Sequence, residues 1–179
     1  FLTPQELERV KRSFKVDPAR LAALRTTAVF PYQMDDHVTY FLATGDVELG
    51  RNIAKTAGEL LQQGVDGFVK QDQLRNQGSC PHHRTGTIMW SAILGDLALS
   101  PGVLTPPERA RLKAQLAFLG YTLASPTFHS PERGYKANPN MTTTARGMLG
   151  LVACCVNRHP QARAGAQIAI YEAPSELET

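Results

Sequence analysis

The segment Leu104-Thr105-Pro106-Pro107-Glu108-Arg109 begins an amphipathic helix and repeats a pattern found at the start of the chain. The earlier copy reads Leu2-Thr3-Pro4-Gln5-Glu6-Leu7. In each copy a threonine N-cap precedes a proline at the first helical position, and a glutamate follows the threonine by three residues. This is the capping-box pattern. Two capped helix starts separated by several helices favour an array of helical hairpins, in which long loops at one rim carry the chemistry.

The rest of the chain also has the pattern of helices, marked by caps, glycines and apolar spacing. The expected helical ranges are 3–14, 17–27, 34–43, 46–63, 85–99, 105–123, 140–156 and 160–171. Gly64 is expected to end the fourth helix. No stretch alternates well enough to form a strand, so the sequence predicts an all-α fold, with residues 1–179 in a single helical domain.

The composition is that of a soluble globular protein, with 42% hydrophobic and 20% charged residues among 179. No apolar run approaches the length of a membrane span, so a membrane partner is not expected. The net charge of +3 suits an acidic ligand. Lysines and arginines are scattered rather than striped and aromatic residues are few, which disfavours a nucleic-acid surface.

The cysteines indicate neither a disulfide framework nor a metal site. Cys80 stands alone, while Cys154 and Cys155 lie inside an apolar helical run and are expected to be small buried hydrophobic residues. The adjacent His82 and His83 are poorly arranged to chelate one ion, and no helical histidine or cysteine pair has ligand spacing. We therefore expect no metal and no cofactor.

The loop Arg133-Gly134-Tyr135-Lys136-Ala137-Asn138-Pro139-Asn140-Met141 runs directly into an apolar helical pattern. Helix starts present unpaired N–H groups and the positive end of a dipole, so this polar loop is suited to cradle an anionic group. The alternative interpretation is that Asn138 and Asn140 only cap the helix and shape the turn.

Two long loops, 64–84 and 124–140, each precede an apolar helix. If the helices alternate in direction, both loops open on the same rim. The residues brought together there would be His82, His83, Arg84, His129, Arg133, Tyr135, Asn138 and Asn140. An asparagine or arginine can bind a carboxylate, a histidine can remove the proton from the adjacent carbon, and a tyrosine can protonate a leaving oxygen. The alternative for His82 and His83 is an exposed loop pair; His37 and His159 are expected to have no special role.

The order of these features resembles the helical toroid domain of heparinase II/III-like and alginate-lyase-like polysaccharide lyases. The resemblance covers Pro81 to about Thr179. The Asn138-Pro139-Asn140-Met141 turn is its most specific part. Its other parts are the apolar helix from Ile88 to Leu99, the helix start at Leu104, Arg158-His159-Pro160 and Glu172-Ala173-Pro174. Residues 1–80 carry no matching motif.

The resemblance implies an incomplete (α/α) toroid of antiparallel hairpins, with a downstream β-sandwich region outside this chain. It implies β-elimination on a uronic-acid-containing polysaccharide, in a periplasmic or secreted protein whose signal segment is not in this chain. Asn140 is the implied carboxylate neutraliser, with Tyr135 and His83 as the nearby acid and base. Asn138, Arg133, His82, Arg84 and His129 are the expected substrate-binding residues. Some lyases of this kind have a histidine directly after the asparagine, where this chain has Met141.

Two other functions remain open from the sequence. A toroid glycoside hydrolase would need two carboxylates in its cleft, and the candidates Asp66, Asp72 and Glu132 lack the apolar surroundings that raise a carboxyl pKa. A non-catalytic, glycan-binding helical scaffold would need only the cleft.

Overall fold

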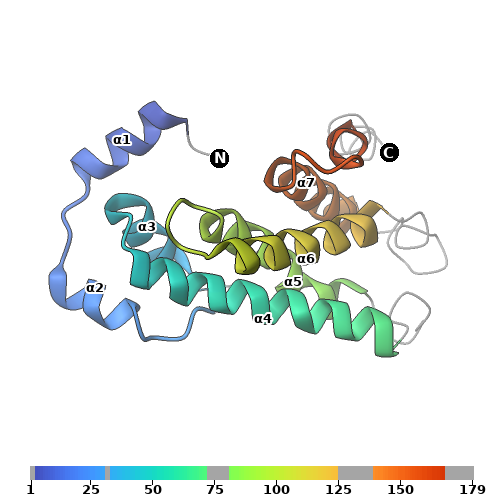
Figure 1. Cartoon of the computed structure of the whole chain (residues 1–179), viewed down its shortest axis with the longest axis horizontal. Helices are drawn as coiled ribbons and strands as arrows, with labels where there is room; N and C mark the ends of the chain where they lie inside the picture. The colour runs from blue at the N-terminus through green and yellow to red at the C-terminus, as the bar shows by residue number, and fades with distance from the viewer. Residues whose placement is uncertain (1–2, 31–32, 72–80, 125–138, 168–179) are drawn as a thin grey trace.

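The structure is a computed structural model that describes residues 3–30, 33–71, 81–124 and 139–167 (Figure 1). Within these ranges the chain forms helices joined by turns and short connections, and no strand occurs there. The predicted all-α fold class is therefore confirmed.

Three short helices form the N-terminal part, α1 (Pro4–Ser13), α2 (Pro18–Leu24) and α3 (Asp35–Thr44). The start of α1 is the predicted capping box: the Glu6 N–H donates to Thr3 Oγ1 over 3.3 Å, and the Thr3 N–H donates to Glu6 Oε2 over 2.8 Å. Asp17 caps α2 by accepting from two backbone N–H groups. Gly45 ends α3 with a φ of 64°, a left-handed conformation that favours glycine.

Four longer helices form the main bundle, α4 (Val47–Gln71), α5 (Pro81–Ala98), α6 (Pro106–Ala124) and α7 (Pro139–Cys155). Residues 162–167 are again helical. At the start of α6 the Thr105 N–H donates to Glu108 Oε2 over 2.8 Å, so the second threonine–glutamate pattern also caps a helix. Both copies of the repeated segment therefore perform the local role predicted for them.

The fourth and fifth helices are longer than predicted. Gly64 does not end α4, which continues to Gln71, and α5 begins four residues before the expected Thr85. Gly64 is buried beside the buried Leu60 and Leu61. Packing of this face against α5 offsets the helix cost of about 1 kcal/mol that glycine carries. As a result His82, His83 and Arg84 lie in the first turn of a helix, and the prediction of a 64–84 loop is wrong.

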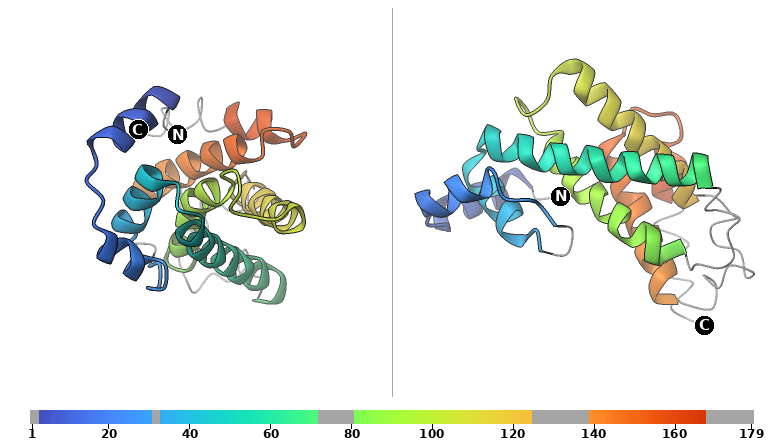
Figure 2. Two further views of the ribbon diagram at one scale, coloured as in Figure 1. Left: turned by 60° about the vertical axis from the view of Figure 1, so that its left-hand side comes forward. Right: turned by 90° about the horizontal axis from the view of Figure 1, so that it is seen from below.

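The four long helices form two antiparallel hairpins, α4–α5 and α6–α7, that stack on each other (Figures 1 and 2). Helix α4 packs against α6, and α5 packs against α7, so like members of the hairpins are neighbours. Helices α1 to α3 lie at one end of this arrangement, with α1 and α2 both packed on α3. The stacked hairpins are the unit predicted from the sequence, while their continuation into a toroid stays a prediction.

One core joins the hairpins, and it contains buried residues from Leu24 to Val156. Its fully buried members include Ile53 of α4, Leu94 of α5, Leu116 of α6 and Val152 of α7. Small residues bring the helices close. A Cβ atom at Gly95 of α5 would lie 3.1 Å from a Leu116 methyl group. The bundle is therefore a fixed frame that determines where each helix begins and ends.

Candidate functional site

Helices α5 and α7 run in the same direction, so their first turns lie at the same end of the bundle. Near their last turns the Cys155 thiol donates to Asp96 Oδ1, with 3.8 Å between sulfur and oxygen. At 1.5 Å per residue, the two helix starts are each about 23 Å along the axis from this contact. Figure 2 shows the ends of α4 and α6 at the same end as these starts. We call this the open end of the bundle.

The predicted site residues divide into two groups. His82, His83 and Arg84 lie in the first turn of α5, and Asn140 is the second residue of α7. Their backbones are therefore at the open end, but their side chains are not among those that the structure describes. The others, His129, Arg133, Tyr135 and Asn138, lie outside the described residues. Of the hydrolase carboxylates, Asp66 accepts a hydrogen bond from Gln62 over 3.0 Å, and Asp72 and Glu132 lie outside the described residues.

A polar groove lies between α4 and α6. Its α4 wall has helical spacing, and its α6 wall does as well. The α4 lining is Arg51, Ala54, Lys55, Gly58, Glu59 and Gln62. The α6 lining is Glu108, Arg111, Leu112 and Gln115. The Gln115 side chain is 8% exposed and donates to the Gly58 carbonyl over 3.4 Å and to Gln62 Oε1 over 3.1 Å.

The charges in this groove are predominantly positive. Arg51, Lys55 and Arg111 line it against two carboxylates, Glu59 and Glu108. Glu108 is also engaged as a cap: its hydrogen bonds from Thr105, together with the charge of Arg51, hold its pKa below the ordinary value. Beyond this groove, α4 and α6 both continue to the open end of the bundle.

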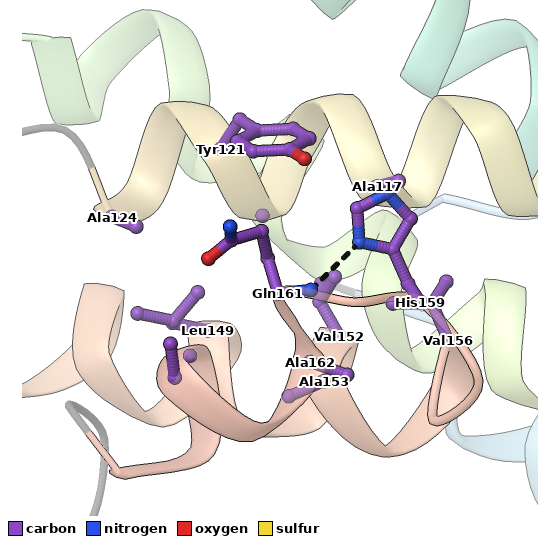
Figure 3. A pocket seen from close by; sticks show the side chains of 13 residues that line it. Ala117, Tyr121, Ala124, Leu149, Val152, Ala153, Val156, His159, Gln161 and Ala162 are labelled. Atoms are coloured by element: carbon purple, nitrogen blue, oxygen red, sulfur yellow. Dashed lines mark hydrogen bonds between the residues drawn. The ribbon is translucent and has the colours of Figure 1, made fainter.

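A second, apolar pocket lies between α6, α7 and the residues that follow α7 (Figure 3). It offers a space of about 100 Å³ and is partly open to solvent. Its wall is built from small or aliphatic residues, which are Ala117, Gly120, Ala124, Leu149, Val152, Ala153, Val156, Ala162, Ala164 and Gly165. We call it the α6–α7 pocket.

Three polar side chains border this pocket. The Tyr121 ring of α6 meets the His159 ring edge to face, with centroids 5.5 Å apart and planes at 82°. The backbone N–H of Gln161 donates to His159 Nδ1 over 3.2 Å, as Figure 3 shows. Because Nδ1 accepts this bond, the neutral imidazole carries its proton on Nε2, where it can donate to another group.

A basic hollow adjoins the α6–α7 pocket and shares Ala117, Tyr121, Val156 and His159 with it. Lys113 and Arg158 also line this hollow. Neither cation forms an ion pair with another residue in the part of the chain that the structure describes. Among the described residues that line the pocket and the hollow, none is an aspartate or glutamate.

Buried titratable groups outside these pockets have structural roles. Burial raises the pKa of the Cys155 thiol to about 12, so the thiol is unreactive at neutral pH. Its neighbour Cys154 is exposed, which contradicts the prediction that both are buried, because the apolar run covers more than one face of α7. Burial lowers the pKa of His37, which contacts the Thr27 carbonyl through Nε2 at 3.2 Å.

The described ranges contain no group of three or more residues able to hold a metal ion. They also contain no helix long and apolar enough to cross a membrane. Comparison of the chain with protein-family models, curated proteins and solved structures finds no match. Its function is therefore inferred from its own residues.

Sequence reasoning missed the α6–α7 pocket entirely. One wall comes from residues 117–124 of α6, and the other comes from 149–165, more than 20 residues further along the chain; the α6 and α7 parts each have the pattern of an ordinary apolar helix. The one available signal was Arg158-His159-Pro160, a basic and aromatic turn beside a helix end. His159, for which no special role was expected, borders the pocket, and only the folded structure brings Tyr121 to it.

Proposed function

We propose that this chain belongs to a polysaccharide lyase that cleaves a uronic-acid-containing glycan by β-elimination at the open end of the bundle. Asn140 neutralises the uronate carboxylate, a histidine of the α5 start removes the proton, and Tyr135 protonates the leaving oxygen. The observation that carries the proposal is the parallel direction of α5 and α7, which puts the backbones of His82, His83 and Asn140 at one end.

The electrostatics of the α5 and α7 starts support the same substrate class, while the ends of α4 and α6 bring the opposite dipole charge to this end of the bundle. The first N–H groups of a helix lack intrahelical partners, and the dipole gives its start a partial positive charge. Here two such starts occur together, one with the sequence His82-His83-Arg84 and the other with Asn140. A carboxylate is the kind of group that two helix starts and an arginine stabilise.

The proposed reaction consumes no water and needs no cofactor. The histidine takes the proton from the carbon that bears the carboxylate, and the resulting negative charge spreads onto the carboxylate oxygens. Asn140 lowers the barrier by stabilising that charge where it develops. The carbon–oxygen bond at the next ring carbon then breaks, a carbon–carbon double bond forms, and the leaving oxygen receives a proton from Tyr135.

The groove between α4 and α6 supports a polymeric substrate. From Arg51 to Gln62 it follows about 16 Å of helix at 1.5 Å per residue, enough for several sugar rings of an extended glycan. Its three cations and two buried or half-buried amides, Gln62 and Gln115, match a chain that carries both carboxylates and hydroxyl groups. The remote part of such a substrate would contribute binding energy while its cleaved bond lies at the open end.

The test is incubation of the full-length protein with alginate, heparan-type glycans and other uronate polymers, while following the absorbance of the unsaturated product. We expect product with one of them, and Asn140→Ala should lower kcat by about 100-fold to 1,000-fold, the cost of losing one stabilising donor. The matched control is Asn157→Ala, which changes an exposed asparagine beyond the opposite end of α7.

Absence of product from every uronate polymer, with helical circular dichroism and a cooperative melt intact, would overturn the proposal. Binding of an acidic glycan without turnover would favour the non-catalytic scaffold instead. Equal losses in Asn140→Ala and Asn157→Ala would assign the effect to the helix rather than to the carboxylate.

A further inference from the structure

We infer that the α6–α7 pocket and its basic hollow form a binding site for a small amphiphilic anion, a molecule with an apolar body and a single acidic head. The site is built from other residues than those of the proposed reaction, and its ligand is not the acidic polymer of that reaction. The inference is therefore independent of the lyase proposal.

The apolar half of the site is defined by the small size of its lining residues. Alanine and glycine make up seven of its thirteen described residues, and Leu149, Val152 and Val156 supply half of the rest. The pocket itself offers about 100 Å³ and the hollow it opens onto about 510 Å³, so the two together fall within the range of small-molecule sites. The wall offers few polar partners, so a polar molecule would lose hydrogen bonds with water on entering, whereas an apolar group would gain contacts.

The charged half of the site supplies the recognition of the head group. Lys113 approaches from α6 and Arg158 from the turn after α7, so cations from two elements border one hollow. A carboxylate or sulfonate placed there would meet two positive charges that are not already paired within the described residues. With no acidic side chain in the described lining, nothing there would repel it.

The Tyr121 and His159 pair joins the two halves. Both rings line the apolar pocket and the basic hollow, so a ligand that occupies both must pass them. The Tyr121 residue is 55% exposed, which leaves its ring face available for stacking. His159 Nε2–H, fixed as the donor by the bond from Gln161, can donate to the head group at the boundary.

The site is distinguished from ordinary imperfect packing by its mixed chemistry. An empty packing defect between helices is lined by apolar atoms alone. It would not be expected to open onto two cations that lack ion-pair partners. A surface that exposes aromatic and apolar groups beside unpaired cations can exist in water. Binding of an amphiphilic anion lowers its free energy, because the anion covers the apolar groups and approaches the cations.

The experiment uses the fluorescent probe 8-anilinonaphthalene-1-sulfonate, which has an aromatic body and one sulfonate. We expect one probe per folded chain, displaced by octanoate at a concentration at least tenfold lower than by octanol. Ala117→Leu, which adds bulk to the wall shared by both halves, should weaken probe binding at least tenfold. Ala164→Leu fills the same pocket from an exposed position and serves as a second variant if Ala117→Leu does not fold.

The charge arm uses the double variant Lys113→Gln/Arg158→Gln. It should weaken octanoate at least fivefold and leave octanol unchanged, because only the head group meets these cations. The matched controls are Arg51→Gln/Lys55→Gln, which removes two cations from the other groove, and Ala110→Leu, which adds the same bulk to an exposed face of α6. Wild-type affinity in both Ala117→Leu and Ala164→Leu, or equal displacement by octanoate and octanol, would overturn the inference.

Discussion

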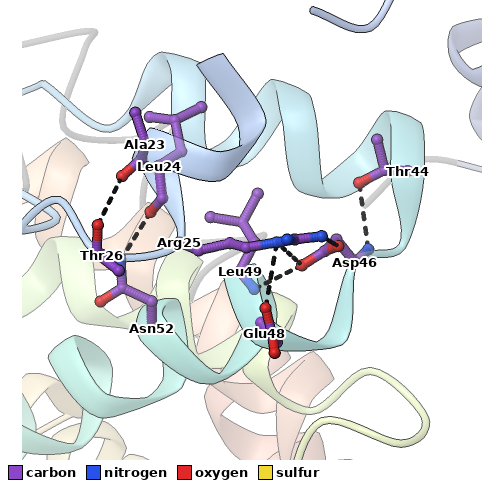
Figure 4. A network of polar contacts seen from close by, with 9 residues as sticks. All are labelled: Ala23, Leu24, Arg25, Thr26, Thr44, Asp46, Glu48, Leu49 and Asn52. Carbon is purple, nitrogen blue, oxygen red and sulfur yellow. Dashed lines mark hydrogen bonds and ion pairs between the residues drawn. The ribbon is translucent and has the colours of Figure 1, made fainter. Parts of the chain in front are cut away.

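Two contacts between helices in this molecule are built by opposite means. At the corner between α2 and α4, charged and polar side chains make specific hydrogen bonds (Figure 4). Between α6 and α7, glycine, alanine and aliphatic side chains make the contact and leave the pocket of Figure 3. The difference shows that polar side chains fix the position of α2 on α4, whereas the small residues between α6 and α7 leave a space beside the contact.

The polar corner centres on Asp46, the residue before α4. Its carboxylate receives two hydrogen bonds from Arg25, over 2.6 and 3.2 Å, and caps α4 through the Leu49 N–H over 2.9 Å. The Asn52 amide donates to the carbonyls of Leu24 and Thr27 over 2.9 and 2.8 Å. The end of α2 is thereby held to the start of α4 through directed bonds, which tolerate little change of geometry.

On the apolar side, Leu149→Ala should weaken the contact between α6 and α7. Leu149 is 3% exposed, lines the α6–α7 pocket and packs where a Cβ atom at Gly165 would lie 3.3 Å from its methyl group. We expect a loss of about 2–3 kcal/mol in the free energy of unfolding, because a large buried side chain is removed beside existing space. Chemical denaturation followed by circular dichroism measures it.

A matched truncation in the bundle centre, Leu116→Ala, should cost more, about 3–5 kcal/mol, since Leu116 is fully buried and packs closely on Gly95 of α5. If Leu149→Ala proves as costly as Leu116→Ala, the α6–α7 contact is as tightly packed as the core and its pocket is not a permanent space.

The second change, Asp46→Ala, breaks the polar corner and should cost about 1–2 kcal/mol. It removes a helix cap together with the partner of Arg25. The hydrogen bond from Arg25 holds the pKa of Asp46 below its ordinary value. The contribution is therefore complete above the unfolded pKa of about 3.8 and is lost as pH falls through the folded pKa.

The control for this change is Glu48→Ala. Glu48 lies 3.4 Å from the same arginine, but its side chain is 70% exposed, so water screens the pair and its loss should cost less than about 0.5 kcal/mol. Thermal melts of both variants at neutral and acidic pH separate them. Equal losses would mean that charge near Arg25, rather than the cap and directed bonds of Asp46, stabilises the corner.

The fold was predictable wherever the signal was local. The capping patterns at Thr3 and Thr105 were predicted to begin helices, and both do. The predicted helix 17–27 does begin at the Asp17 cap, and the predicted helix 34–43 ends at the αL glycine Gly45. Gly64 carried the same local signal and was misleading, because burial against α5 outweighs its weak helix propensity. Capping residues and glycines therefore determine where a helix ends only if packing against a neighbouring helix does not stabilise further helical turns.

The candidate sites were less predictable for the same reason. The sequence predicted that α5 and α7 start at the same end only on the assumption that successive helices alternate in direction. The contents of the α6–α7 pocket could not be inferred, since Tyr121 and His159 are 38 positions apart in the chain and meet only through packing of α6 on α7. Helical glycines are the hardest positions to interpret, because the sequence does not show whether a glycine faces solvent or a neighbouring helix.

Two helical glycines, Gly58 of α4 and Gly120 of α6, differ in what an added methyl group would meet. Gly58→Ala should stabilise the protein by about 0.5–1 kcal/mol, the helix preference of alanine, since a Cβ atom there meets nothing within 4 Å. Gly120→Ala has the same preference, but its Cβ atom would lie 3.1 Å from Val152 Cγ1. Val152 is 1% exposed and β-branched, so it cannot easily rotate away, and the gain should be cancelled.

The two variants therefore test whether the contact between α6 and α7 at Gly120 and Val152 is rigid, so that the adjoining α6–α7 pocket keeps its size. A rigid contact gives a difference of about 0.5–1 kcal/mol between Gly58→Ala and Gly120→Ala in matched denaturation curves. If Gly120→Ala is as stabilising as Gly58→Ala, then α6 and α7 can move apart at no cost. The pocket could then widen to fit ligands of different size. It would lose the selectivity for a small apolar body that we infer from its wall of small residues.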